Sequence, residues 1–192
     1  MIFLLALAAA VAPAPDPASI QSLYEVGQCI ATRSPQTARE VLGMDFRSSE
    51  YQRMLKAIGR GSGPCMAPGT DFRSSGMLFA GSIAEGLLKT EFKPADLAAD
   101  FAFDPARAPI EARNASEEMA LCMVMRAPAQ TAHLLQTAPA SREEADAEDV
   151  LAPLLSDCLK KGAKLELNRP GMRSLLALAA YRIVTAPKGA AQ

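Results

Sequence analysis

The sequence predicts an all-α protein made of two similar helical units. Tryptophan is absent and aromatic residues make up only 5% of the chain, whereas alanine, leucine and methionine, which keep their side-chain freedom in a helix, are plentiful. Apolar residues recur at spacings of three and four, and no segment alternates as a strand does. Finally, "CIATRSP" at 29–35 returns as "CMVMRAP" at 122–128, which indicates an internal repeat.

Length and charge narrow the classes of function. The chain has 192 residues, of which 49% are apolar, and its formal net charge is −1. This length supports one sizeable core and argues against disorder. Because acidic and basic residues nearly cancel and no Lys/Arg stripe with interleaved aromatics occurs, we expect no nucleic-acid partner.

The N-terminal residues have the pattern of an export signal. An apolar run from Ile2 to Ala12 is followed by small residues and prolines, and it is too short to span a bilayer. We therefore predict a signal peptide over 1–14, with a short buried helix as the alternative, and a periplasmic or secreted mature chain. No later apolar segment is long enough for an integral membrane span.

A shift of 93 positions aligns the first half of the chain with the second without a gap. Nine identities fall in 45 positions, and they include every cysteine. The identical pairs begin at Glu25 and Glu118 and end at Gly69 and Gly162. The repeat predicts an internal duplication, with helical units over 15–90 and 115–185, a linker over 91–114 and a disordered tail over 186–192.

Each unit is predicted to contain four helices in the same order. The first helices are expected over 18–32 and 116–126, and the second begin at Pro35 and Pro128, where proline suits the first helical position. The third follow Ser48-Ser49 and Ser141, with capping boxes formed by Ser49 with Gln52 and by Ser141 with Glu144; they are expected to end before residue 59 and around residue 153. The fourth cover 76–88 and 171–184.

The linker is predicted to hold one short helix over "PADLAADF". Prolines flank this segment and separate it from both units. We expect Phe92, Phe101 and Phe103 to pack against the units, because they would otherwise leave an apolar surface exposed.

The four cysteines, Cys29, Cys65, Cys122 and Cys158, are the most informative residues of the chain. An even number of cysteines at matched spacing in an exported protein indicates disulfides. We expect Cys29 to pair with Cys65 and Cys122 with Cys158, since a unit that once existed alone could form only its own bond. A zinc site, a redox pair and unpaired thiols are the alternatives, and the first two are disfavoured because no C-x-x-C motif occurs.

Arg33 and Arg126 occupy matched positions at the ends of the first helices. A cation there complements the helix dipole and can bind the last carbonyl groups, so we predict a capping role, with an anion site as the alternative. Glu25 and Glu118 lie about two turns upstream and could pair with these arginines only through tertiary contacts.

Three other motifs are interpreted as structural. His133, the only histidine, is expected on a solvated helix face, since its counterpart in the first unit is Glu40. The repeated "DFRSS" at 45–49 and 71–75 precedes helices, where serine caps free amides. The acidic run "EEADAED" at 143–149 is expected to form a solvated face in the first turns of a helix.

The unit as a whole resembles a known kind of protein. It consists of C-x3-R-x-P, a capped helix, a second cysteine, and Gly-Met opening an Ala/Leu-rich helix. This arrangement is similar to that of uncharacterised exported bacterial all-helical proteins with a duplicated two-cysteine module. The resemblance covers nearly the whole mature chain, and it implies no activity for any residue.

The motifs do not assemble an acid and base pair, a nucleophile with a partner, or a metal-ligand set. We therefore expect a non-enzymatic protein-interaction or envelope-associated structural module that uses no cofactor or metal. The alternative is a carrier of a small apolar ligand between the two units, suggested by the nine methionines and the small residues Gly76, Ala80 and Ala84. A hydrolase with an unfamiliar site is a third possibility.

Overall fold

The structure is a computed structural model that describes residues 16–66, 74–163, 165 and 167–187. The predicted signal peptide at 1–14 and the end of the predicted tail, from residue 188, lie outside these residues. Within them the chain forms nine α-helices, one short 3₁₀ helix and no strand. The elements are α1 (Pro17–Arg33), α2 (Pro35–Gly43), α3 (Ser49–Gly61), η1 (Gly63–Cys65), α4 (Gly76–Glu91), α5 (Leu97–Phe101), α6 (Ala115–Arg126), α7 (Pro128–Gln136), α8 (Arg142–Cys158) and α9 (Arg169–Thr185).

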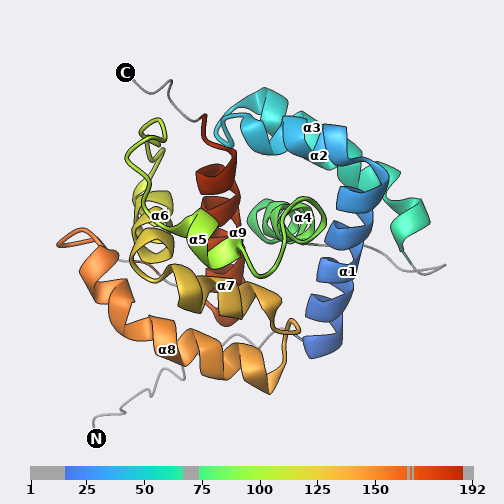
Figure 1. The fold of residues 1–192 in the computed structure, drawn as a ribbon. Helices are drawn as coiled ribbons and strands as arrows, with labels where there is room; N and C mark the ends of the chain where they lie inside the picture. The colour runs from blue at the N-terminus through green and yellow to red at the C-terminus, as the bar shows by residue number, and fades with distance from the viewer. Residues whose placement is uncertain (1–15, 67–73, 164, 166, 188–192) are drawn as a thin grey trace, which may run out of the picture.

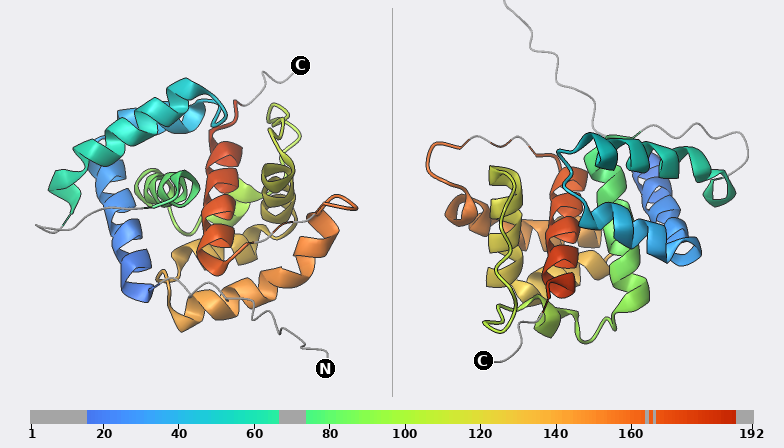
Figure 2. Two further views of the ribbon diagram at one scale, coloured as in Figure 1. Left: turned by 180° about the vertical axis from the view of Figure 1, so that it is seen from behind. Right: turned by 90° about the horizontal axis from the view of Figure 1, so that it is seen from above.

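Helices α4 and α9 form the centre of the molecule. In Figure 1, α2 and α3 lie on one side of this central pair and α7 and α8 lie on the opposite side. The view from above in Figure 2 shows four helices side by side in the order α1, α4, α9, α6. The two central helices, α4 and α9, are the fourth helices of the two halves, and the first helices, α1 and α6, lie on their outer sides. This is the arrangement expected of two units related by a pseudo-twofold axis, and the duplication itself stays a prediction.

The central helices pack closely because small residues line their contacts. A Cβ atom on Gly27 of α1 would lie 2.4 Å from the backbone carbon of Ser82 in α4. A Cβ atom on Gly81 of α4 would lie 2.4 Å from Cβ of Ser174 in α9. Such distances are far below van der Waals contact, so glycine is required at both crossings. Ala80 and Ala84, expected on a ligand-facing surface, are instead fully buried between helices.

The helices of the two units begin within two residues of their predicted starts, but one cap and two helix ends differ from the prediction. Ser48, not Ser49, caps α3 by accepting a hydrogen bond from the amide of Tyr51. Helix α3 continues to Gly61, and α8 runs through Pro153 to Cys158 instead of ending there. Proline removes only one helical hydrogen bond, and the leucines on both sides of Pro153 pack against the core, so the last turns of α8 persist.

The linker contains α5 where a short helix was predicted. Phe101 is fully buried and Phe92 packs against the core, as expected. Phe103 is 73% exposed, so its prediction is wrong. The carbonyl group of Pro187 accepts a hydrogen bond from the amide of Ala108, which ties the chain after α9 to the linker.

Among the described helices, none has both the length and the apolar character needed to cross a membrane.

Candidate functional site

The two predicted disulfides are present. Cys29 is bonded to Cys65 and Cys122 to Cys158, with Cα atoms 5.6 Å apart in both pairs. All four cysteines are used in this way, so they do not form a thiolate metal site. Cys65 lies in η1, just after α3, and Cys158 is the last residue of α8, so each bond joins the first helix of one half to the chain at the end of its third helix. Both bonds stabilise the fold.

Arg33 and Arg126 lie in the last turns of α1 and α6, where a cation complements the helix dipole as predicted. Neither side chain donates a hydrogen bond to a helix carbonyl in the described part of the chain. The guanidinium of Arg126 lies 3.5 Å from a carboxylate oxygen of Asp157, and the side chain of Arg33 forms no hydrogen bond or ion pair with other described residues. Glu118 pairs with Lys160 at 2.8 Å and not with Arg126. These contacts lie on the exposed surface, where an ion pair contributes about 0–1 kcal/mol.

The motifs interpreted as structural are placed largely as predicted. His133 is exposed on α7. Ser48 and Ser75, from the two "DFRSS" segments, cap α3 and α4, while the remaining residues of the second copy up to 73 lie outside the described part of the chain. Ser141 caps α8 by accepting a hydrogen bond from the amide of Glu144. The Glu144 carboxylate accepts from the amide of Ala140, one residue earlier than in a standard capping box.

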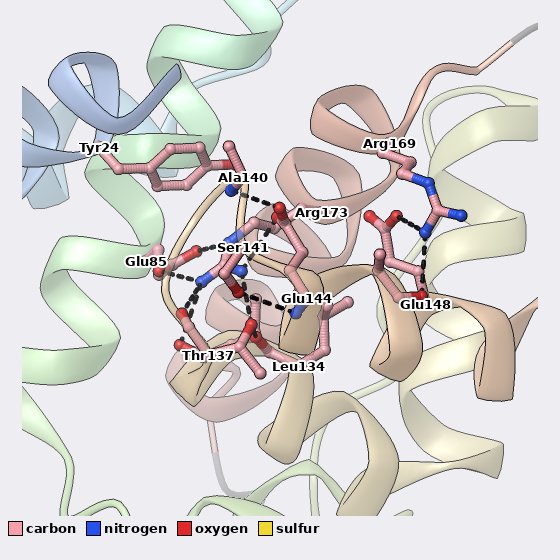
Figure 3. A network of polar contacts seen from close by, with 12 residues as sticks. Tyr24, Glu85, Leu134, Thr137, Ala140, Ser141, Glu144, Glu148, Arg169 and Arg173 are labelled. Carbon is pink, nitrogen blue, oxygen red and sulfur yellow. Dashed lines mark hydrogen bonds and ion pairs between the residues drawn. The ribbon is translucent and has the colours of Figure 1, made fainter. Parts of the chain in front are cut away.

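The acidic run at 143–149 is not a uniformly solvated face, and the prediction is wrong for two of its members. Glu144 and Glu148 are buried on the inner side of α8. Their positions four residues apart place both on one side of the helix, facing α9. The reason for their burial is that each meets an arginine of α9, as Figure 3 shows.

The most buried charge of the described chain is the guanidinium of Arg173 on α9, whose side chain has 0% exposure. It forms two hydrogen bonds of 2.7 Å with the carboxylate of Glu85 on α4. It also donates to the carboxylate of Glu144 at 3.1 Å and to the hydroxyl and carbonyl oxygens of Thr137 at 3.0 and 2.9 Å. All of its N–H groups have acceptors, as burial of a charge requires. We call Arg173, Glu85, Glu144 and Thr137 the Arg173 cluster.

The Arg173 cluster joins the two halves of the molecule (Figure 3). Glu85 belongs to the first half and the other members of the cluster to the second. The centroid of the Tyr24 ring of α1 lies 5.2 Å from the guanidinium carbon. Burial lowers the pKa of Arg173, but its hydrogen bonds and charge interaction with Glu85 outweigh that effect and raise it. Lys89, 2.6 Å from Glu85, makes the number of cations equal to the number of carboxylates. Together with Lys89, the cluster is therefore a charge-neutral clamp.

Glu148 lies next to the Arg173 cluster, but its carboxyl group is only partly hydrogen-bonded. Its Oε2 atom lies 3.3 Å from Arg169, and its buried Oε1 atom has no hydrogen-bond partner among the described residues. Burial, reinforced by the negative charge of Glu144, raises the pKa of Glu148 to about 7, although Arg169 acts in the opposite direction. The carboxyl group thus gains a proton near neutral pH.

A pocket of about 360 Å³ lies between the two halves, where the C-terminal half of α9 meets α3, α4 and α6. We call it the interunit pocket. Its volume falls in the range of small-molecule sites. Most of its wall is apolar, formed by Leu42, Met44, Phe46, Met77, Leu175 and Leu178. Except for Gln52, the charged and amide side chains of the wall come from 113–117 and from Arg182.

The polar side of the interunit pocket is organised by Arg113 and Glu117. The carboxylate of Glu117 forms an ion pair with Arg182 of α9 and accepts a hydrogen bond of 2.7 Å from the backbone amide of Arg113. The guanidinium of Arg113 donates to the carbonyl of Met44 at 3.0 Å, and its central carbon lies 5.6 Å from the Phe46 ring centroid. The arrangement offers an apolar chamber with one cationic edge.

The sequence analysis predicted neither the Arg173 cluster nor the polar side of the interunit pocket. Arg173 and Glu85 could have been found as single charges inside otherwise apolar helical stretches, because such charges are almost always paired when buried. Arg113 had no comparable signal, since it lies in the linker among other charged residues. Only the fold brings the linker beside 44–46.

The chemistry of the site does not indicate a metal centre: the described residues contain no group of three or more His, Cys, Asp or Glu side chains arranged to hold an ion. Comparisons with protein-family models, with curated proteins and with solved structures gave no match. The resemblance to exported two-cysteine proteins therefore stays a prediction. The fold and the site define a disulfide-bonded helical protein with an apolar pocket between its halves.

Proposed function

We propose that this protein binds a small apolar molecule in the interunit pocket and acts as its carrier. The observation that carries this proposal is a mostly apolar chamber of about 360 Å³ whose wall is contributed by both halves. This was the alternative function from the sequence, and the geometry favours it over the leading one. Of the residues that suggested a carrier from the sequence, Gly76 lines the chamber together with Met77, whereas Ala80 and Ala84 are buried in the helix packing.

We further propose that the carrier works in the periplasm or outside the cell. Two disulfides, together with the signal-like residues at 1–14, support export into an oxidising compartment. Each disulfide cross-links one of the two halves that contribute to the pocket wall.

The test uses the oxidised full chain and two measurements. Native mass spectrometry and an organic extract of the protein, purified from the envelope fraction of an expressing bacterium, should reveal a bound small molecule. Titration of the delipidated protein with the neutral apolar dye N-phenylnaphthylamine should give saturable fluorescence with one site.

A blocking variant distinguishes the pocket from general surface binding. Leu178 is half-buried in the pocket wall, so Leu178→Trp should fill part of the chamber and weaken dye binding by about tenfold. Leu154→Trp is the matched control, because Leu154 is equally half-buried but lies on α8 outside the pocket. Equal dye binding by both variants, or no saturable binding by the parent protein, contradicts the proposal.

The protein-interaction or structural role remains the second candidate, and one observation favours it. Phe103 exposes 73% of its surface in the linker, and a large exposed aromatic residue suits a contact with another protein. Cross-linking in the envelope fraction through a photoreactive residue at position 103 tests this role. The expectation that the protein is not an enzyme stays a prediction.

A further inference from the structure

The charges that line the interunit pocket do not cancel. Three ionised side chains form its polar edge, Arg113, Glu117 and Arg182, and Arg47 lies next to Arg113. Arg47 pairs with Asp45 at 2.7 Å, and Arg182 pairs with Glu117. This leaves Arg113 as the one cation of the group without a carboxylate within ion-pair distance among the described residues.

The surroundings of Arg113 hold its side chain in place without neutralising it. Met44 supplies a carbonyl oxygen and Phe46 supplies an aromatic ring, both of which are uncharged partners. The carbonyl of Arg113 accepts a hydrogen bond of 3.3 Å from Arg47, and its amide donates to Glu117, so the backbone is also fixed. A cationic group is thus held at the pocket wall with most of its N–H groups not bonded to described residues.

The electrostatic surroundings of Arg113 favour the binding of an anion. Burial lowers the pKa of Arg113, and the positive charge of Arg182 lowers it further. Both effects mean that the cation is less stable here than in water. A negative charge brought by a ligand would offset them, and a carboxylate matches the planar fork of a guanidinium.

We propose that the ligand of the interunit pocket is a small amphiphile with an apolar body and one carboxylate, and that Arg113 binds the carboxylate. The inference rests on the proposed carrier function and specifies its ligand class. A single surplus positive charge matches a monoanion, and the apolar wall of Leu42, Met77, Leu175 and Leu178 matches an aliphatic tail.

The test compares decanoate with decanol, which have the same chain length but differ in charge. Both are measured by displacement of N-phenylnaphthylamine from the oxidised protein at neutral pH. We expect decanoate to bind about tenfold more tightly than decanol, as a charge-assisted hydrogen bond in a partly buried site predicts. This comparison needs no variant, so it does not depend on the folding of a mutant.

Variants then assign the preference to one residue. Arg113→Met keeps the apolar stem and should reduce decanoate affinity about tenfold while changing decanol affinity less than about twofold. Arg53→Met is the matched control, since Arg53 is exposed on α3 outside the pocket and its removal changes the net charge equally. Arg113→Lys should restore part of the preference.

The outcomes separate the two proposals. If decanoate and decanol bind with equal affinity, or if Arg53→Met weakens decanoate as much as Arg113→Met does, the carboxylate inference is overturned and the carrier proposal stands. If neither compound displaces the dye and the dye itself does not bind, both proposals fall.

Discussion

Removing the guanidinium of Arg173 should strongly destabilise the protein, because two buried carboxylates pair with it. In Arg173→Met, Glu85 would keep only the half-exposed Lys89 as a cation, and Glu144 would lose its only ion-pair partner among the described residues. The carbonyl of Thr137 would also lose its donor. Breaking a buried ion pair from one side costs about 3–5 kcal/mol, so we expect this loss in the free energy of unfolding.

Arg169 provides a matched control one helical turn away. It also contacts acidic residues of α8, but its side chain is 51% exposed. We expect Arg169→Met to cost about 1 kcal/mol or less. Urea unfolding of the oxidised proteins, followed by far-ultraviolet circular dichroism, gives both values, and an equal effect of the two substitutions would refute the clamp role of Arg173.

A double-mutant cycle then separates the ion pair from simple loss of packing. Because buried pairs replaced by apolar groups are often neutral, Arg173→Met combined with Glu85→Met should recover at least about 2 kcal/mol relative to the sum of the single changes. Additive effects would show that Arg173 and Glu85 stabilise the fold independently.

Three further predictions concern stability. The pKa of Glu148 is raised from 4.5 to about 7 in the folded protein, so the folded state holds more protons and the free energy of unfolding should fall as pH rises through this interval. The full pKa shift corresponds to about 3 kcal/mol, which solvent screening reduces to about 2. Urea titrations at the two ends of the interval should show this difference, and Glu148→Gln should remove it. Gly27→Ala should cost about 3 kcal/mol through its clash with the backbone of Ser82, whereas Gly43→Ala, at a position with no atom within 4 Å, should be neutral or slightly stabilising in thermal melts. Replacing both cysteines of either disulfide by alanine should cost about 4 kcal/mol, since each closes a loop of about 37 residues, and non-reducing peptide mapping should find no linkage between the two halves.

The sequence was sufficient for the secondary structure because its signals were local. Proline at the first helical position predicted the starts of α2 and α7, and the matched cysteine spacing predicted both disulfides. The helix ends were less predictable: α3 ends at Gly61 within a glycine-rich segment, whereas α8 continues past Pro153, where Leu154 and Leu155 pack against the core. Whether a helix continues past a proline therefore depends on how the neighbouring side chains pack in the tertiary structure.

The functional features were not predictable in this way, because they depend on contacts between distant residues. Glu144 was expected on a solvated face, yet a guanidinium 29 positions away makes its burial favourable. Arg113 contacts Met44 across 69 positions of chain, and no periodicity encodes such a contact. Local patterns predict which face of a helix is apolar, but they do not predict which charges a neighbouring helix will bring.

The Arg173 cluster and the interunit pocket are connected through the central helices, although they lie at different positions along them. On α4, Met77 lines the pocket and Glu85 belongs to the clamp, eight residues or about 12 Å further along the helix. Because the pocket wall is shared between the halves, its width depends on their relative position. The Arg173–Glu85 pair and the close crossing at Gly81 fix that position. Arg173→Met should therefore weaken dye binding even in protein that remains folded, although Arg173 does not line the pocket. Unchanged dye affinity in the folded variant would show that the Gly81 crossing alone holds the two walls apart.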